Sequence, residues 1–222
     1  MKSGRRIAVL LLVLLAGASH APAQEAKNTE LDDRVAAFLA KMRGQWRDMN
    51  VPHVDGQILY DIVVKNNYRS ALEIGTSTGH SAIWIAWAMS KTGGKLVTIE
   101  LDERRYREAL ANFKEAAVSE WVDARLGDAH ELVPELAGPW DFVFIDADKD
   151  WYTNYAKALV PKMLPGGCIS AHNIPRPGGR RGGMHGTAEY YEYMKSLPEF
   201  ETSFVDASQN GVSVSYKRKP SK

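Results

Sequence analysis

The stretch ALEIGTSTGHS, residues 71–81, reads as a short apolar strand that passes through two glycines straight into a helix. In an open parallel sheet, ligands bind beyond the carboxyl ends of the strands, and glycines there let the backbone approach the ligand closely. Ser77 stands where a dinucleotide-binding G-x-G-x-x-G turn has its second glycine, so the spacing disfavours a nicotinamide cofactor. The stretch predicts an α/β fold with a ligand crevice at this turn.

From this turn onward, short apolar segments alternate with amphipathic ones, which is typical of βαβ units and a parallel sheet covered on both faces. We expect strands over 71–74, 95–100, 122–126, 141–146 and 168–171, and helices over 80–91, 103–117, 129–136 and 151–163. Residues 201–206 and 211–217 flank a turn-forming segment, which predicts an antiparallel hairpin. Together these segments predict a doubly wound, mostly parallel sheet of seven strands.

Two more helices are expected before the first strand. Apolar residues recur at helical spacing from Thr29 to about Trp46, and Thr29 is of a type that caps a helix start. The second helix covers 56–65.

The first 23 residues differ from the rest of the chain. Three basic residues precede an apolar run over 7–16 and the small-residue pattern Ala21-Pro22-Ala23. This order predicts a signal peptide over 1–23, a single domain over 24–222, and a secreted or periplasmic protein. A transmembrane helix needs about 20 apolar residues, so no stable membrane span is expected, with an uncleaved anchor as the alternative.

Composition limits the classes of partner. Of the 28 basic residues, three lie in the first 23 positions, which leaves 25 against 27 acidic residues and a formal charge of −2. This balance gives no indication of nucleic-acid binding. Cys168 is the single cysteine, so an intramolecular disulfide and a cysteine-based zinc site are excluded, and we expect it in the core.

Acidic residues end or follow three of the predicted strands. Glu100 ends the second strand, 21 positions after Gly79, where a carboxylate can accept from both hydroxyls of a ribose. Asp128 follows the third strand and can accept from an adenine amino group, cap the next helix, or do both. After the fourth strand, FIDADKDWY (144–152) gathers three aspartates around Lys149, which by itself equally fits a solvated turn with ion pairs.

These motifs together carry a family resemblance. From about residue 50 onward, the chain resembles the small class I S-adenosylmethionine-dependent O-methyltransferases of the catechol and caffeoyl-CoA O-methyltransferase type. LEIGTSTGHSA is similar to their cofactor motif, TIELDE to the segment with the ribose acid, and FIDADKDWYTNY to the signature after the fourth strand. The resemblance implies a Rossmann-like fold, S-adenosylmethionine as cofactor, a small aromatic hydroxyl substrate and a homodimer. The cofactor-binding residues that it implies are Glu73, Gly75, Ser77, Gly79, Ser81, Glu100, Leu101, Asp128, Ala129, Asp146 and Asp148.

The same resemblance implies the catalytic groups. Asp146 corresponds to a metal ligand, and Lys149 to the general base that takes a proton from the substrate hydroxyl. A divalent cation that chelates two neighbouring hydroxyls both positions and acidifies them, and oxygen ligands suit magnesium. A free lysine side chain has a pKa of about 10.4, so a lysine base needs burial or a nearby cation.

The chain departs from the family pattern after the fifth strand. The metal-dependent relatives carry Asp-Asn there, whereas this chain has His172-Asn173. Three interpretations stay open: a softer transition metal bound by Asp146, His172 and Asn173; His172 as a second base without a metal; or a degenerate site. A noncatalytic protein that binds an adenosyl ligand is the alternative function.

A Gly- and Pro-rich segment over 175–186 predicts a loop that we match to no known substrate loop. Its arginines and His185 suit either a flexible surface or an anionic or phenolic substrate. Three tyrosines follow on a predicted helix, whose spacing turns only some of them toward the crevice, at positions 190, 191 and 193.

Overall fold

The computed structural model describes residues 20–46, 48–176, 185–208 and 210–220, with side chains from residue 28 onward. Most of the predicted signal peptide, and most of the predicted loop over 175–186, therefore lie outside the described residues. Within the described ranges, no helix has the length and apolar character that crossing a membrane requires.

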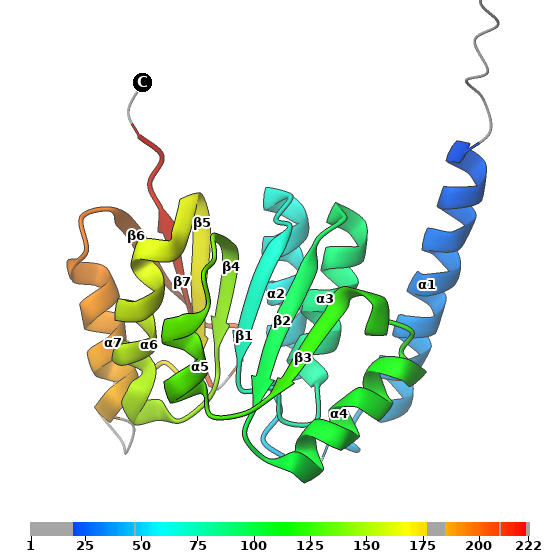
Figure 1. Cartoon of the computed structure of the whole chain (residues 1–222), viewed down its shortest axis with the longest axis horizontal. Coiled ribbons are helices and arrows are strands. Elements are labelled where there is room, and N and C mark those ends of the chain that lie inside the picture. Colours follow the sequence, from blue (N-terminus) through cyan, green and yellow to red (C-terminus); the bar gives the residue numbers. More distant parts are fainter. Residues whose placement is uncertain (1–19, 47, 177–184, 209, 221–222) are drawn as a thin grey trace, which may run out of the picture.

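A seven-stranded sheet forms the centre of the molecule, in the order β3-β2-β1-β4-β5-β7-β6 (Figure 1). Neighbouring strands among the first five run parallel, and β7 lies antiparallel to both β5 and β6. This confirms the predicted doubly wound sheet and its C-terminal hairpin. The strands are β1 Ser70–Ile74, β2 Lys95–Glu100, β3 Val122–Leu126, β4 Trp140–Ile145, β5 Met163–His172, β6 Phe200–Val205 and β7 Val212–Lys217.

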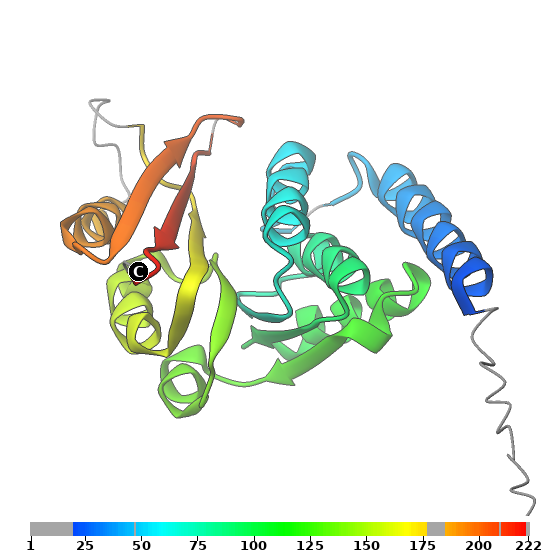
Figure 2. The same ribbon diagram turned by 90° about the horizontal axis from the view of Figure 1, so that it is seen from above.

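Helices cover both faces of the sheet, as Figure 2 shows from above. They are α1 His20–Met42, α2 His53–Asn66, α3 His80–Thr92, α4 Glu103–Glu115, α5 Ala129–Glu135, α6 Tyr152–Leu159 and α7 His185–Ser196, with 3-10 turns η1 Ser119–Trp121, η2 Lys149–Trp151 and η3 Val160–Lys162. One core cluster joins α1 to α4 with one face of the sheet, and a second joins α5, α6 and α7 with the other. Cys168 is fully buried in the first cluster, as predicted.

The N-terminal helix differs from its prediction. It begins at His20 and ends at Met42, so Thr29 lies inside the helix and does not cap its start. Pro22 falls in the first helical turn, where a backbone N–H has no partner within the helix, so a proline is tolerated there. The predicted start at Thr29 was wrong because a residue that can cap a helix does not end one already formed.

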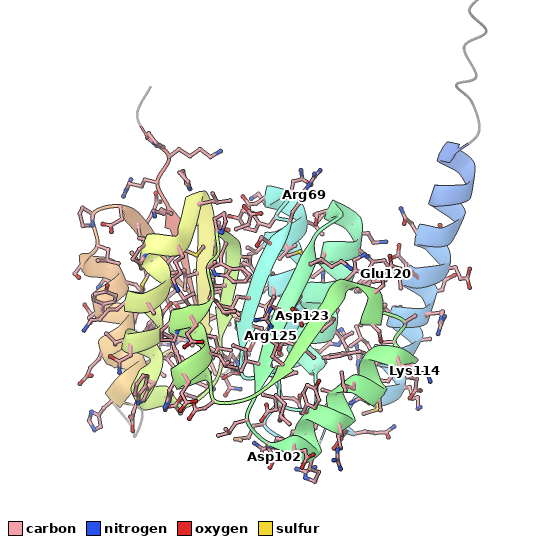
Figure 3. The ribbon with its side chains drawn as sticks, in the orientation of Figure 1. Arg69, Asp102, Lys114, Glu120, Asp123 and Arg125 are labelled. Atoms are coloured by element: carbon pink, nitrogen blue, oxygen red, sulfur yellow. The ribbon has the colours of Figure 1, made fainter. Side chains whose placement is uncertain are left out.

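The carboxyl ends of the parallel strands lie together along one edge of the sheet. Figure 3 labels Asp102 just past the end of β2, whereas Arg69, which precedes β1, lies at the opposite edge. The loops that leave β1, β2, β3, β4 and β5 therefore meet on the side of Asp102, which is the side where open α/β sheets bind ligands.

Candidate active site

A crevice of about 770 Å³ opens at the carboxyl edge of the sheet. It lies between the loops after β1, β2, β3, β4 and β5, and the segments around residues 50 and 210 complete its wall. Its lining includes many of the predicted site residues, namely Gly75, Ser77, Glu100, Leu101, Asp128, Ala129, Asp146, Asp148, Lys149, His172 and Asn173.

The turn after β1 depends on two glycines with left-handed backbone. Gly75 has φ +95°, and a Cβ at this position would lie 2.5 Å from the carbonyl oxygen of Asp146. Gly79 has φ +98° and begins α3, and a Cβ there would lie 2.7 Å from the Phe113 ring. The glycines are therefore needed for close packing of the turn against the β4 loop and α4.

Glu100 presents a fixed carboxylate to the crevice. Its Oε2 accepts from the Ser77 N–H at 2.7 Å, and its Oε1 accepts from the Asp102 N–H at 2.9 Å. Each carboxylate oxygen keeps further acceptor capacity, so this geometry suits the two adjacent hydroxyls of a ribose. The Ser77 hydroxyl, which is buried and also lines the crevice, has no hydrogen-bond partner in the structure.

Glu73 lies beneath the turn in the core. Its Oε2 accepts from the Thr98 hydroxyl at 2.5 Å, while its Oε1 is buried without a partner. Burial raises the pKa of Glu73 to about 8, against the lowering effect of the nearby Ser81 and Thr98 hydroxyls. Glu73, Gly79 and Ser81 are not among the residues that line the crevice.

Asp128 both caps a helix and lines the crevice. Its Oδ1 accepts from the His130 N–H at 2.8 Å at the start of α5, which confirms the capping role. The residue remains at the crevice wall next to Ala129. The two predicted roles of Asp128 are therefore compatible.

The loop after β4 holds an ion pair in the crevice. Lys149 Nζ donates to Asp146 Oδ1 at 2.6 Å and to the Tyr152 hydroxyl at 2.9 Å. Tyr152 is fully buried and packs edge-on against Tyr190 of α7. Burial alone would raise the pKa of Asp146, but His172 and Lys149 outweigh it and hold that pKa below its ordinary value.

Asp148 turns away from Lys149 toward aromatic residues. Its Oδ1 accepts from the Tyr155 hydroxyl at 2.9 Å, and its Oδ2 lies 3.2 Å from His130 Nε2. The His130 ring stacks on Trp151 with a centroid separation of 3.7 Å. His130 and Tyr155 also line the crevice, so Asp148 orients one aromatic wall of it.

His172 lies between two carboxylates at the floor of the crevice. Its Nε2 is 2.9 Å from Asp55 Oδ2, and its Nδ1 is 3.2 Å from Asp146 Oδ2. Burial lowers the pKa of His172, but the two carboxylates raise it to about 9. The ring is therefore protonated near neutral pH, which does not suit a general base.

Sequence reasoning missed Asp55, which is 1% exposed in the first turn of α2. It lies 117 positions before His172, and nothing in its local pattern signals a role in the site. Met49, Asn50, Arg105, Tyr155 and Asn210 also line the crevice without having been predicted. None of the three tyrosines of α7 lines it.

The residues do not fit a divalent cation in this arrangement. A metal would need a ring nitrogen lone pair from His172, yet each ring nitrogen faces a carboxylate oxygen, which accepts hydrogen bonds and so favours a proton on that nitrogen. Both oxygens of Asp146 already have cationic partners. Among the described residues, no group of three or more His, Cys, Asp or Glu side chains is arranged to hold a metal ion.

The adenosyl cofactor implied by the motifs fits the crevice better. The fixed carboxylate of Glu100 and the unpartnered Ser77 hydroxyl offer polar contacts, and Ile99, Leu101 and Ala129 offer apolar surface.

Comparison with known proteins gives consistent matches. Residues 24–178 match the O-methyltransferase family. The chain is 40% identical over 114 residues to a catechol O-methyltransferase of Niastella koreensis, covering 50% of this chain and 51% of that protein. It is 33% identical over 134 residues to a caffeoyl-CoA O-methyltransferase of Medicago sativa, covering 58% of this chain and 54% of that protein. The chain thus spans about half the length of the curated relatives it matches.

The fold also matches a solved structure. An O-methyltransferase from Bacillus cereus, crystallised in complex with SAH, superposes with a TM-score of 0.69 and 25% sequence identity. The superposition covers 92% of this chain and 94% of that one.

Proposed function

Because the chain belongs to the O-methyltransferase family, we propose that it transfers a methyl group from S-adenosylmethionine to a hydroxyl of a small aromatic molecule. One observation carries the proposal: Glu100 and the Asp146–Lys149 pair, which come from different loops, face the same crevice of about 770 Å³. A crevice of this size accommodates an adenosyl cofactor with a small substrate beside it. The named relatives act on catechol and caffeoyl-CoA, and both names denote aromatic hydroxyl compounds.

The cofactor end of the crevice is assigned to the loops after β1, β2 and β3. Glu100 accepts from the ribose hydroxyls, and Asp128 accepts from the adenine amino group beside Leu101 and Ala129. Gly75 allows close approach of the backbone to the ligand. Ser77 supplies a hydroxyl to the polar part of the ligand.

The reacting end is assigned to the loop after β4. When bound, S-adenosylmethionine supplies a methyl group that is activated by the positive sulfonium. Lys149 lies within hydrogen-bond distance of Asp146 and Tyr152, so its amino group is held at one place in the crevice. Acting as the base, this amine would take the proton of the substrate hydroxyl, and the oxygen would form its bond to the methyl group as the bond from that methyl group to sulfur breaks and SAH leaves.

The wall of the crevice is also partly apolar. Met49 and Leu101 are 70% and 69% exposed and lie at the crevice, and Tyr155 adds an aromatic face. Exposed apolar side chains at a polar crevice favour a flat aromatic ring over a charged ligand. This supports a catechol-like substrate.

The test uses the full chain with S-adenosylhomocysteine (SAH) and catechol as probes. Calorimetric titration should show one SAH site per chain, and mass spectrometry should detect methylated catechol when S-adenosylmethionine is supplied. Lys149→Ala should keep SAH binding and lose turnover. Binding of SAH with turnover that is unchanged in Lys149→Ala would remove the assigned base, and binding with no turnover on any hydroxyl compound would favour a noncatalytic adenosyl-binding protein.

We also propose that residues 1–23 direct export and that the protein acts as a homodimer. The basic, apolar and small-residue order of that segment supports the first proposal, and the family resemblance supports the second. S-adenosylmethionine is made in the cytosol, so an exported enzyme needs cofactor outside it. Fractionation of cells with an antibody to the C-terminus tests export, and sedimentation of the purified chain tests the dimer.

A further inference from the structure

A chain of close contacts between charged side chains runs across the floor of the crevice. It links Asp55 in α2, His172 at the end of β5, and Asp146 after β4. The histidine ring lies between the two carboxylates, with its nitrogens 2.9 Å and 3.2 Å from the nearest oxygens. Asp55 is 1% exposed and His172 is 3% exposed, whereas the Asp146 side chain is 12% exposed at the crevice.

Local packing explains how Asp55 reaches this place. Gly56 follows it, and a Cβ there would lie 2.2 Å from a carbon of the Trp84 ring. Because glycine has no Cβ, α2 can pack closely against α3 at this position. The Ser208 hydroxyl, from the loop between β6 and β7, donates to Asp55 Oδ2 at 2.6 Å. The packing of α2 on α3 and the hydrogen bond from Ser208 thus hold Asp55 in place, in addition to its contact with His172.

The geometry determines where the protons lie. An ionised carboxylate only accepts hydrogen bonds, so each ring nitrogen of His172 that contacts one must donate. A ring that donates from both nitrogens is an imidazolium and has no lone pair to offer a metal. Asp146 is then contacted by two cations, because its other oxygen accepts from Lys149 at 2.6 Å.

The charges in this cluster already balance. Two carboxylates, Asp55 and Asp146, face two cations, His172 and Lys149. A divalent cation at Asp146 would stand against both cations, and repulsion between like charges is screened less beside the mostly buried Asp146 and His172 than in open solvent. The positive charge that such an ion would bring to Asp146 is thus supplied by side chains.

We propose that the imidazolium of His172, clamped between Asp55 and Asp146, occupies the place of a divalent cation in this crevice, so that the protein needs no such ion for methyl transfer. The inference rests on the proposed function and specifies its chemistry. His172 and Asp55 are positioning residues: they fix one oxygen of Asp146 and leave the other to hold Lys149. Asn173 then remains free to contact the substrate at the crevice wall.

The first test uses metal alone. Manganese chloride is titrated calorimetrically into the metal-stripped full chain saturated with SAH, and we expect no stoichiometric site. Nitrogen-15 NMR of the same sample should show both ring nitrogens of His172 protonated, with the signals assigned by their loss in His172→Gln. One manganese per chain, or an unprotonated His172 nitrogen, would overturn the inference.

The second test builds a metal site. In the double variant, His172→Asp removes the imidazolium and adds a carboxylate beside the oxygen donors of Asp146 and Asn173. Asp55→Asn removes the other carboxylate that contacts His172 in the wild type. This double variant should bind manganese at least tenfold more tightly than the wild type, and its turnover of catechol should rise with added manganese. Wild-type turnover should change less than twofold when a chelator is added. Asp55→Asn alone is the matched control and should gain no manganese site.

The outcomes separate this inference from the proposed function. If SAH does not bind the wild type, the proposed function fails, whatever the metal titration shows. If SAH binds and turnover requires a divalent ion, the function stands and the inference fails. If the double variant does not fold, the manganese titration and the NMR of the wild type still decide.

Discussion

Replacing Glu73 with Gln should change how stability depends on pH. Glu73 is fully buried in β1, with its Oε2 bonded to Thr98 and its Oε1 unpartnered. Burial raises its pKa from 4.5 to about 8, so the carboxyl is protonated in the native state at pH values where the unfolded chain has ionised it. Gln has nearly the same shape and does not titrate in this range.

The sign and size follow from proton linkage. Because the folded pKa lies above the unfolded one, the stability that the proton gives is complete below about pH 4.5 and is lost as the pH rises through about 8. Between pH 5.5 and 7.5 the unfolding free energy of the wild type should fall by about 2.5 kcal/mol relative to Glu73→Gln. The pKa shifts of other groups, such as His172, occur in both proteins, so their effects cancel in the difference between the two unfolding free energies.

Urea unfolding at pH 5.5, 6.5 and 7.5, followed by the fluorescence of the six tryptophans, measures this difference. The m-value should stay the same in both proteins, because the surface exposed on unfolding does not change. Glu135→Gln, an exposed residue at the end of α5, is the matched control and should track the wild type at each pH. If the unfolding free energy of Glu73→Gln changes with pH as that of the wild type does, within about 0.5 kcal/mol, then Glu73 is ionised in the native protein and the reasoning is refuted.

Three further changes test the site. Gly75→Ala places a Cβ 2.5 Å from the Asp146 carbonyl at φ +95°, so it should destabilise the chain by more than about 2 kcal/mol in urea unfolding and abolish calorimetric SAH binding. Lys149→Ala should lower catechol turnover by about 100-fold or more, since it removes the assigned base, and leave the Kd for SAH within about threefold. Asp128→Ala removes the cap of α5, so it should lower the unfolding free energy by about 1 kcal/mol and weaken SAH binding as well.

Two of these changes, at Gly75 and Lys149, have a control in the chain. Gly93→Ala also introduces a side chain at positive φ, +71°, but meets nothing within 4 Å, so it should cost about 1–2 kcal/mol and leave SAH binding intact. Lys157→Ala removes a lysine from α6, outside the crevice, and should keep full turnover. Equal losses of SAH binding in both glycine variants would show that backbone strain alone, and not the contact with the β4 loop, causes the loss in Gly75→Ala.

The sequence by itself determined the sheet and the edge that carries the site. The alternation of apolar and amphipathic segments placed every predicted strand of the sheet, with shifts of a few residues at most ends and a longer start for β5. Because the carboxyl ends of parallel strands meet at one edge, residues that follow separate strands, such as Glu100 and Asp146, had to share a crevice. Local patterns suffice for such inferences, since they depend on chain direction and periodicity alone.

Only the tertiary structure decided what His172 does. Its sequence position allowed a metal ligand, a base or a degenerate site, and the choice depends on which groups face its two ring nitrogens. One of these is Asp55, which lies 117 residues away on a different element and which Gly56 brings near through packing on Trp84. The proton state of a buried ring is set by neighbours within about 3 Å, and no local pattern in a sequence encodes contacts of that separation.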